Sequence, residues 1–580
     1  MSRISRPSTR STWRPPGPRP RTRQSTVVDE GVVCALCESR GGVASVGMAF
    51  ALLHTGHIVL CEIVDSQTYA RTIQKIALFQ PSQIIVPSLP SNSSKLYKII
   101  TENVPEVRLV HVQRALYNLE EGNEYLESLC LADYVEPLRV ALHAKFYAVC
   151  SFAAILKHIS SSHGVTFAPR SLYVRYEGSQ GSMLVDFGTT RNLETVQNLN
   201  NPNSNHSLLG TLNHTQTPMG ARLLRLSILQ PLLDSVIING RLDAMEELSH
   251  NQDAFFAIRA ALTPFRDLDR LLTSLIAIPA KPSLQHSERR INDIITLKAT
   301  ISMVDALVDA LQNCQCEVLR HAQSICTDAS YGRIQEIIDT IINPDVQLAK
   351  GALDLRNQRC YAVKSGFNGL LDVARQTYKE ATADVVALIE RYNTDHEMAI
   401  DLKYETPRGF FMRAMRDDDR ALPDAFINRV KKKTWIEFSS LELLKRNAKV
   451  NDSLVEILLL SDSTIETLTS NVRREVASIY RLSECVALLD MIASNVHLCT
   501  VSEYVRPEFN DKQVLAIKSG RHPIRERDNL RRFQANDTYA ASTCRFQIIT
   551  GVNMSGKSTY LKQVALLVIM ACVDCWHVGS

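Results

Sequence analysis

The sequence has 580 residues, of which 45% are hydrophobic and 22% charged, an ordinary composition for a globular protein with about three to five domains. Its longest uninterrupted apolar stretch, Val564–Val573, is too short to cross a bilayer, so we expect no membrane association. The formal net charge is +4, but residues 1–28 hold seven Arg and no acidic residue, which leaves −3 for the remainder. This balance excludes a general polyanion-binding surface, and any nucleic-acid surface must be local.

Residues 1–29 are predicted to form a disordered basic tail. Five Pro within the first 20 residues prevent a continuous helix, which argues against a mitochondrial presequence. A role of the tail in nuclear import or DNA tethering stays open.

The 14 Cys, without a signal peptide, are expected to be reduced thiols of an intracellular protein. The pairs Cys34/Cys37 and Cys572/Cys575 lie outside zinc-ribbon spacing and are expected to be packing residues.

After residue 30 the pattern changes to short apolar runs typical of a small α/β domain. The predicted strands are Val32–Cys37, Val46–Leu53, Ile58–Val64 and Gln83–Pro87, with a helix at Gln67–Phe79. Glu38 and Glu62 fall near these strands, but two carboxylates alone do not make a metal-dependent nuclease. We expect both to be structural.

From Leu138 onward the pattern is helical, with a sheet-like interruption at Ser171–Phe187. Two segments are almost free of helix breakers, one between Pro282 and Pro344 and one between Pro423 and Pro507. In the second, apolar residues recur at steps of three and four, which predicts one helix of about 43 residues and ~65 Å. Strict heptads are absent, so we expect levers packed on partner helices, and an unbroken rod over residues 451–507.

A basic insertion with interleaved aromatic residues separates the two long segments. It is the best local candidate for contacts with DNA phosphates. The acidic residues Asp417–Asp419 and Glu437 partly offset its charge, so a merely solvated face stays open as an alternative. The candidate DNA-binding residues are Arg408, Arg413, Arg416, Arg429, Lys431, Lys432, Lys433 and Lys445.

Residues 551–558 match the phosphate-binding loop G-x-x-x-x-G-K-[ST]. An apolar run at Phe546–Thr550 predicts the strand that enters the loop, and Thr559–Val573 predicts the helix that leaves it. The glycines let backbone N–H groups point at the phosphates, the lysine reaches the β/γ-phosphates, and the serine hydroxyl ligates Mg²⁺. The candidate ATP-binding residues of the loop are Gly551, Val552, Asn553, Met554, Ser555, Gly556, Lys557, Ser558 and Thr559, with Ser558 also the metal ligand.

Hydrolysis normally needs a second strand that ends in Asp, often followed by Glu. Only 23 residues follow Lys557, too few for a helix and that strand. Ile457–Asp462 imitates the pattern but lies in the long helical repeat, so we discount it. We therefore assign no catalytic residue and leave open whether this chain is an enzyme.

At these residues the chain resembles the MutS family. Thr550–Gln563 is similar to the family's phosphate loop almost residue for residue, with Val552 in place of the usual Pro. Gly520–Pro523 and Phe533–Asp537 resemble the segment before the loop, and the resemblance implies that Phe533 stacks on adenine with Gln534 beside it. Asp186–Glu194, Thr217–Leu224 and Arg241–Leu248 resemble the family core.

Within the family, the resemblance is to the meiotic members. No Phe is followed two residues later by Glu, so the wedge with which mismatch sensors stack on a mispaired base is missing, and Ser555 stands where those sensors carry Gly. The resemblance implies ATP and Mg²⁺ as cofactors, double-stranded DNA and branched recombination junctions as partners, and a heterodimer with a MutS homologue five-type protein. It also implies contact with MutL-type proteins and a nuclear location.

The resemblance implies a multidomain α plus α/β fold with an RNase H-like connector, a mostly helical core and lever with an inserted clamp, and a partial P-loop ATPase domain. The family's ATPase continues past the loop, so we expect a C-terminally truncated chain. We expect nucleotide state to open or close the clamp through the lever. A mismatch-repair sensor, an unrelated phosphate-loop kinase or transporter ATPase, and a non-hydrolysing scaffold stay open as alternatives. The expected parts are the tail (1–29), connector (30–165), core and lever (166–395), clamp (396–450), returning lever helix (451–507) and partial ATPase domain (508–580).

Overall fold

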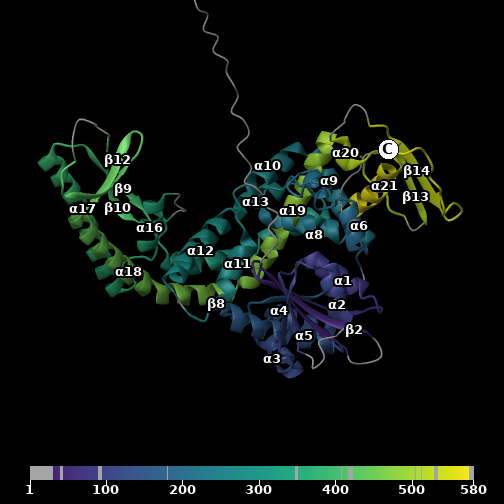
Figure 1. The fold of residues 1–580 in the computed structure, drawn as a ribbon, viewed down its shortest axis with the longest axis horizontal. Helices are drawn as coiled ribbons and strands as arrows, with labels where there is room; N and C mark the ends of the chain where they lie inside the picture. The colour runs from purple at the N-terminus through teal and green to yellow at the C-terminus, as the bar shows by residue number, and fades with distance from the viewer. Residues whose placement is uncertain are drawn as a thin grey trace, which may run out of the picture.

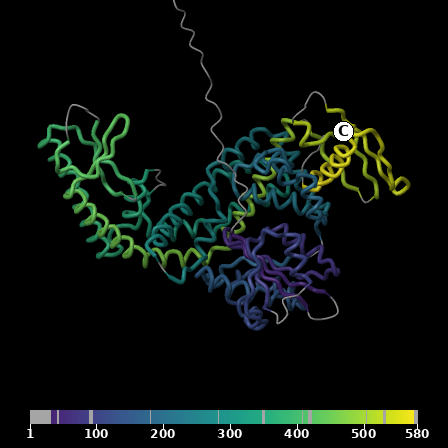
Figure 2. The backbone as a smooth tube through the Cα atoms, in the orientation of Figure 1, coloured from purple at the N-terminus to yellow at the C-terminus, as the bar shows by residue number. Residues whose placement is uncertain are grey.

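The computed structural model describes residues 31–573 except 40–43, 89–94, 179–180, 282, 347–350, 407, 416–421, 503, 511 and 528–532. The predicted tail therefore lies outside the described residues. The molecule is elongated, with a small sheet at the tip of a long helix pair and the C-terminal elements at the opposite end (Figures 1 and 2). An α/β domain lies beside the central helices.

The N-terminal domain is built on one six-stranded sheet, in the order β5-β4-β1-β2-β3-β7. Strand β2 pairs antiparallel with β1 and with β3. Strand β4 pairs parallel with β1 and with β5, and β7 pairs parallel with β3. The four strands predicted from alternating apolar residues are confirmed to within about two residues. The strands are β1 Val32–Glu38, β2 Ser45–Leu52, β3 His57–Val64, β4 Gln83–Pro87, β5 Arg108–Val112 and β7 Tyr173–Tyr176.

Helices cover both faces of this sheet because successive strand residues point to opposite sides. Cys34 and Leu36 pack with α1 and α2, whereas Val33 and Ala35 pack with α5. Gly47 lets α5 approach closely, since a Cβ there would lie 2.1 Å from the backbone of Tyr147. The helices are α1 Ala70–Phe79, α2 Lys95–Asn103, α3 Leu119–Leu129, α4 Ala132–Ala141 and α5 Phe146–His158.

Glu38 and Glu62 both have structural partners, as expected. Glu62 accepts hydrogen bonds from the amides of Tyr147 and Ala148 and so caps the start of α5. Glu38 accepts one from the hydroxyl of Tyr69 at 2.5 Å. Among the described residues no group of three or more His, Cys, Asp or Glu could hold a metal ion.

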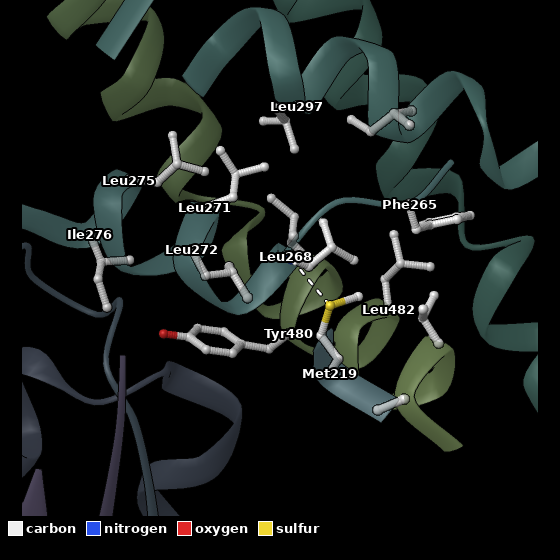
Figure 3. Packing of buried hydrophobic residues seen from close by; sticks show 14 of the residues in the cluster. Met219, Phe265, Leu268, Leu271, Leu272, Leu275, Ile276, Leu297, Tyr480 and Leu482 are labelled. Atoms are coloured by element: carbon white, nitrogen blue, oxygen red, sulfur yellow. Dashed lines mark hydrogen bonds between the residues drawn. The ribbon is translucent and has the colours of Figure 1, made fainter. Parts of the chain in front are cut away.

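The centre of the molecule is a bundle of helices around one apolar core. Figure 3 shows part of it, where Leu268, Leu271 and Leu272 meet Tyr480 and Leu482. Of the predicted sheet-like stretch Ser171–Phe187, the described residues form β7 and isolated bridges at Leu172 and Ser182, and at its end Asp186 accepts from Thr189 N and caps a short helix. The helices are α6 Phe187–Asn192, α7 Leu208–Leu212, α8 Pro218–Leu229, α9 Ser235–His250, α10 Gln252–Leu262, α11 Leu268–Ile276, α12 Leu284–Ser302, α13 Val304–Leu311, α14 Glu317–Cys326, α15 Ala329–Ile341, α16 Ala352–Cys360 and α17 Gly369–His396; two short strands, β6 Val165–Phe167 and β8 Ala277–Pro279, pair beside them.

The expectation of a lever between Pro282 and Pro344 is wrong. This stretch forms the four separate helices α12 to α15, and the ascending arm is α17 instead. Breaks form here without proline because distant and local side chains take over backbone N–H groups. Glu247 accepts from Gln315 N and Cys316 N before α14, and Asp328 accepts from Ser330 N at the start of α15.

The expectation of an unbroken rod over residues 451–507 is also wrong. Helix α18 runs from Leu441 to Arg473 and α19 from Val476 to Ser502, and the two follow different directions (Figure 1). Around Arg474 and Glu475 the amides bond three residues back instead of four. Side chains of α15 bond on both sides of this break, because Arg333 bonds to Glu475 and Tyr331 donates to the carbonyl of Ser478 in the first turn of α19.

Helix α19 is long and apolar enough to cross a membrane by length and composition. However, 72% of its apolar window is buried inside the protein. Helices α8, α9, α10, α11 and α14 pack around it. Its apolar character is therefore accounted for by its central place in the core.

The α/β domain docks on this core through an aromatic contact at His57. The His57 ring lies 5.0 Å from Tyr173 and 5.3 Å from Tyr480, and the Tyr480 hydroxyl donates to the carbonyl of Gly56. Burial lowers the pKa of His57 from 6.5 to about 4, helped by the charges of Arg175 and Arg222 and opposed by Asp269.

We expect this histidine to make the fold sensitive to acid. Between pH 6.5 and about 4 the unfolded chain binds a proton at His57 that the folded chain rejects, so stability is complete above pH 6.5 and falls below it. The loss should reach up to ~1.4 kcal/mol per pH unit. Urea unfolding at several pH values measures it. His57→Phe should flatten the dependence, and an unchanged slope in that variant would contradict the assignment.

Candidate nucleic-acid and nucleotide sites

The basic insertion folds into a four-stranded antiparallel sheet at the end of the α17–α18 pair (Figure 1). The predicted boundary at residue 450 is too late. Ser440 accepts a hydrogen bond from Leu443 N and starts α18 at Leu441, so Lys445 lies on the helix. The strands are β9 Ile400–Glu405, β10 Gly409–Met415, β11 Phe426–Lys431 and β12 Trp435–Ser440, in the order β11-β12-β10-β9.

Two of the candidate arginines contact a buried carboxylate within this sheet. Glu437 accepts from Arg408 at 3.0 Å and from Arg413 at 3.2 Å. The Arg408 guanidinium lies over the Phe411 ring and that of Arg413 over Trp435. Burial alone would raise the pKa of Glu437, but the hydrogen bonds from both arginines outweigh it and the pKa is lowered. These arginines therefore hold the clamp sheet together.

The candidate lysines have a different environment. Lys431, Lys432 and Lys433 are exposed where β11 turns into β12, and Lys445 is exposed on α18. Within the described part of the chain these four make no ion pair. Arg429 instead donates to the carbonyls of Pro423 and Phe426 and fastens the start of β11. Arg416 lies outside the described residues.

The glycine-rich loop leads directly into α21, which runs from Lys557 to Cys572. Gly556 adopts a φ of 95°, which L residues rarely adopt, and so allows the backbone to turn into the helix. The Lys557 ammonium donates to the carbonyls of Gly551 and Val552 at 2.7 and 2.6 Å and thus lies over the loop. Ser558 is exposed in the first helical turn.

This arrangement fits the phosphates of a nucleotide. Lys557 offers a positive charge, and the first turn of α21 offers unpaired N–H groups and the positive end of the helix dipole. The remaining loop residues Asn553, Met554 and Ser555 are exposed, while Thr559 is half-buried. The hydroxyl of Ser558 could act as one oxygen ligand of Mg²⁺ beside the phosphates.

The strand predicted at Phe546–Thr550 is not formed. Phe546 is 82% exposed and Ile548 77%, and no strand pairs with this segment in the part of the chain that the structure describes. An apolar run becomes a strand only where neighbours satisfy its backbone. The nearby strands, β13 Val514–Gly520 and β14 Asn536–Ala541, pair with each other.

Phe533 and Gln534 lie just before β14, separated from it by Ala535, with Phe533 half-buried and Gln534 exposed. The strand is fastened to α21 because the hydroxyls of Thr538 and Tyr560 lie 2.8 Å apart. The strand that follows these two residues is thus held beside α21.

Sequence reasoning missed polar residues on α19. Asp490, Ser494 and Asn495 are almost completely buried and bond to elements on both sides of the helix. The signal in the sequence is that Ser494 and Asn495 follow Asp490 by four and five residues within a mostly apolar helix, where polar groups need partners. The sequence indicates Glu437 only as an acidic residue that offsets positive charge. In the structure it lies directly opposite Arg413 on the neighbouring strand.

Comparison with family models places three domains along the chain. MutS domain II matches residues 31–163, MutS domain III matches residues 188–495, and MutS domain V matches residues 547–578. Domain III alone covers more than half of the chain. The protein therefore belongs to the MutS family, with a mostly helical architecture that also contains sheets.

Individual relatives agree with this assignment. The chain is 38% identical to MutS protein homolog 4 of Homo sapiens over 548 residues, which cover 93% of this chain and 58% of that protein. It is 36% identical to MutS protein homolog 4 of Saccharomyces cerevisiae, over 93% of this chain and 63% of that protein. DNA mismatch repair protein MSH4 of Arabidopsis thaliana is 30% identical, over 94% and 72% respectively. The chain thus spans about six tenths of the length of the first two relatives.

Proposed function

We propose that this protein is an ATP- and DNA-binding clamp of the MutS family that acts on meiotic recombination intermediates and promotes crossing-over. One observation carries the proposal. The glycine-rich loop with Lys557 stands at the start of α21, the residue that follows α21 is hydrogen-bonded to α19, and α18, which precedes α19 in the chain, carries a lysine-rich sheet at its far end (Figure 1). The similarity to proteins named MutS protein homolog 4 supports the meiotic assignment.

The proposed nucleotide is ATP with Mg²⁺. Lys557 would hold the phosphates, Ser558 would contribute to holding the metal ion, and Phe533 with Gln534 would adjoin the base. The metal ion would neutralise phosphate charge when bound. No described residue supplies the Asp-Glu pair that hydrolysis needs, so the proposal covers nucleotide binding and makes no statement about turnover.

The proposed DNA partners are duplex arms and branched recombination junctions. Lys431, Lys432, Lys433 and Lys445 would contact phosphates, which fixes position on a duplex without reading its sequence. Arg408 and Arg413 would contribute indirectly, because Glu437 already engages them. A MutS homologue five-type partner in a heterodimer, MutL-type partners and a nuclear location complete the proposal.

Two finer fold descriptions belong to the same proposal. The connector would be RNase H-like, which three antiparallel strands flanked by the parallel β4 and β5 support. Residues 508–573 would be part of a P-loop ATPase domain. Coupling between the two sites would run through a joint at Arg474 and Glu475, because α18 and α19 are not one rod.

Fluorescence anisotropy with three labelled DNAs tests the proposal. A four-way junction should bind more tightly than a matched duplex of equal length, and a duplex with one mismatch should bind no better than the matched duplex. Added Mg²⁺-ATP should change the junction affinity, since a ligand that favours one conformation shifts the population. Preferential binding of the mismatched duplex would favour a mismatch-repair sensor instead, and equal binding of all three would refute junction recognition.

A further inference from the structure

Three of the buried polar side chains of helix α19, those of Asp490, Ser494 and Asn495, lie on adjoining faces. Asp490 is 1% exposed, and Ser494 and Asn495 are fully buried. A polar group without a hydrogen bond is costly in such surroundings, so the partners of these residues show which elements the helix must hold in register.

On one side, α19 holds the segment that enters α8. The Asp490 carboxylate accepts from Gln216 N at 2.9 Å, from Thr217 N at 2.7 Å and from the Thr217 hydroxyl at 2.6 Å. The approach is close, because a Cβ on Gly220 would lie 2.4 Å from the same carboxylate. Any shift of α19 is therefore transferred to the first turn of α8.

Ser494 extends this contact by one helical turn. Its hydroxyl donates to the carbonyl of Leu212 at 3.0 Å and accepts from His214 N at 2.8 Å. The segment from 212 to 217 is thus bonded to α19 at two successive levels. Arg527, before β14, contacts the same region by donating to the carbonyl of Gly210 at 3.1 Å.

On the other side, α19 contacts the end of α21. The Asn495 amide donates to the carbonyl of Val573 at 3.5 Å, just past the last turn of that helix. Leu566 and Met570 are buried along α21, and Val573 is buried directly after it. A 16-residue helix is about 24 Å long and rigid on that scale, so its two ends move together.

We propose that Asn495, Ser494 and Asp490 form a relay that transmits nucleotide occupancy of the phosphate loop to the segment 212–217 and helix α8. The relay rests on the proposed nucleotide binding. A displacement of Lys557 toward bound phosphates carries the Val573 carbonyl against Asn495, and α19 passes the movement to the amides of Gln216 and Thr217. None of the three residues touches nucleotide, so they are positioning residues.

Hydrogen exchange read by mass spectrometry tests the relay in the 580-residue chain, with and without Mg²⁺ and the non-hydrolysable analogue AMP-PNP. In the unmodified protein, nucleotide should slow exchange in peptides covering 212–220 on the order of ten-fold, within the range of ordinary allosteric couplings. Asn495→Leu keeps the branching at Cγ and removes the donor, and Ser494→Ala removes the bonds to 212–214. Both should still bind a fluorescent ATP analogue while the change in 212–220 disappears.

Asn447→Ala is the matched control, because Asn447 makes two comparable hydrogen bonds to Phe410 in the clamp, far from α21. It should leave the response of 212–220 intact, and thermal unfolding of each variant verifies its fold. If the unmodified protein binds no nucleotide, the proposed function fails, and the relay with it. If nucleotide binds and the variants at 495 and 494 keep the protection, the relay alone is refuted.

Discussion

Replacing Lys431, Lys432 and Lys433 together with Ala should weaken DNA binding and reduce its dependence on salt. These lysines are exposed at the turn between β11 and β12 and make no ion pair within the described residues, so their charges are available to phosphates. Each phosphate contact releases counterions and contributes about 0.9 to the slope of log affinity against log salt, so the slope should fall by up to ~2.7. Anisotropy titrations at several salt concentrations measure it.

A triple variant at Lys95, Lys98 and Lys281 is the control for net charge, because these lysines are also exposed but lie outside the clamp. It should change the slope far less. An equal change in both triple variants would mean that bulk charge, not the clamp, attracts the DNA. An unchanged slope in the clamp variant would remove this turn from the interface.

Replacing Lys557 with Ala should weaken nucleotide binding on the order of 10- to 100-fold, since a hydrogen bond to a charged group contributes about 1.5–3 kcal/mol. The side chain lies over the loop, 2.6 to 2.7 Å from two of its carbonyls, and has no structural partner elsewhere in the described chain. The substitution should therefore spare the fold. Titration with a fluorescent ATP analogue measures the affinity.

Lys518→Ala is the matched control, because Lys518 is exposed on β13 in the same domain. It should bind nucleotide as the unmodified protein does. DNA binding without nucleotide should be equal in all three proteins, while any effect of ATP on DNA binding, including ATP-driven sliding, should be lost at Lys557→Ala. An ATP effect that persists in that variant would disprove coupling through the phosphate loop.

Patterns that depend on near neighbours could be predicted from the sequence. The strand Gln83–Pro87 was predicted to the residue, because a short apolar run between polar turns is sufficient to define it. The helix predicted at Thr559–Val573 forms as α21, which begins two residues earlier, at Lys557. The α/β domain, helical core and basic insertion therefore appear in the expected order.

Features that depend on distant partners could not be predicted. The break at Arg474 and Glu475 involves Tyr331 and Arg333, about 140 residues earlier, which bond to Ser478 and Glu475. No proline or glycine marks it. Likewise, the sequence makes Arg413 a candidate DNA contact because it does not reveal the partner of this arginine. The partner is Glu437, which comes to lie opposite Arg413 only when β10 pairs with β12. Phe546–Thr550 does not form a strand, because no described strand lies beside it to bond with its backbone.

The joint between α18 and α19 changes what kind of motion can reach the clamp. A continuous helix would transmit rotation about its own axis from one end to the other. A break with altered hydrogen bonding does not transmit this rotation, so mainly a change in the angle between the two helices is passed on. Arg473 bonds to Glu466 and to the carbonyl of Leu275, and Glu475 to Arg333, so the pivot is anchored to the core on both sides. Arg290 of α12 also bonds to Asp462 and Glu466 of α18, so the part of α18 next to the joint stays with the core, and the sheet at the tip should move mainly by bending of the arm beyond these contacts.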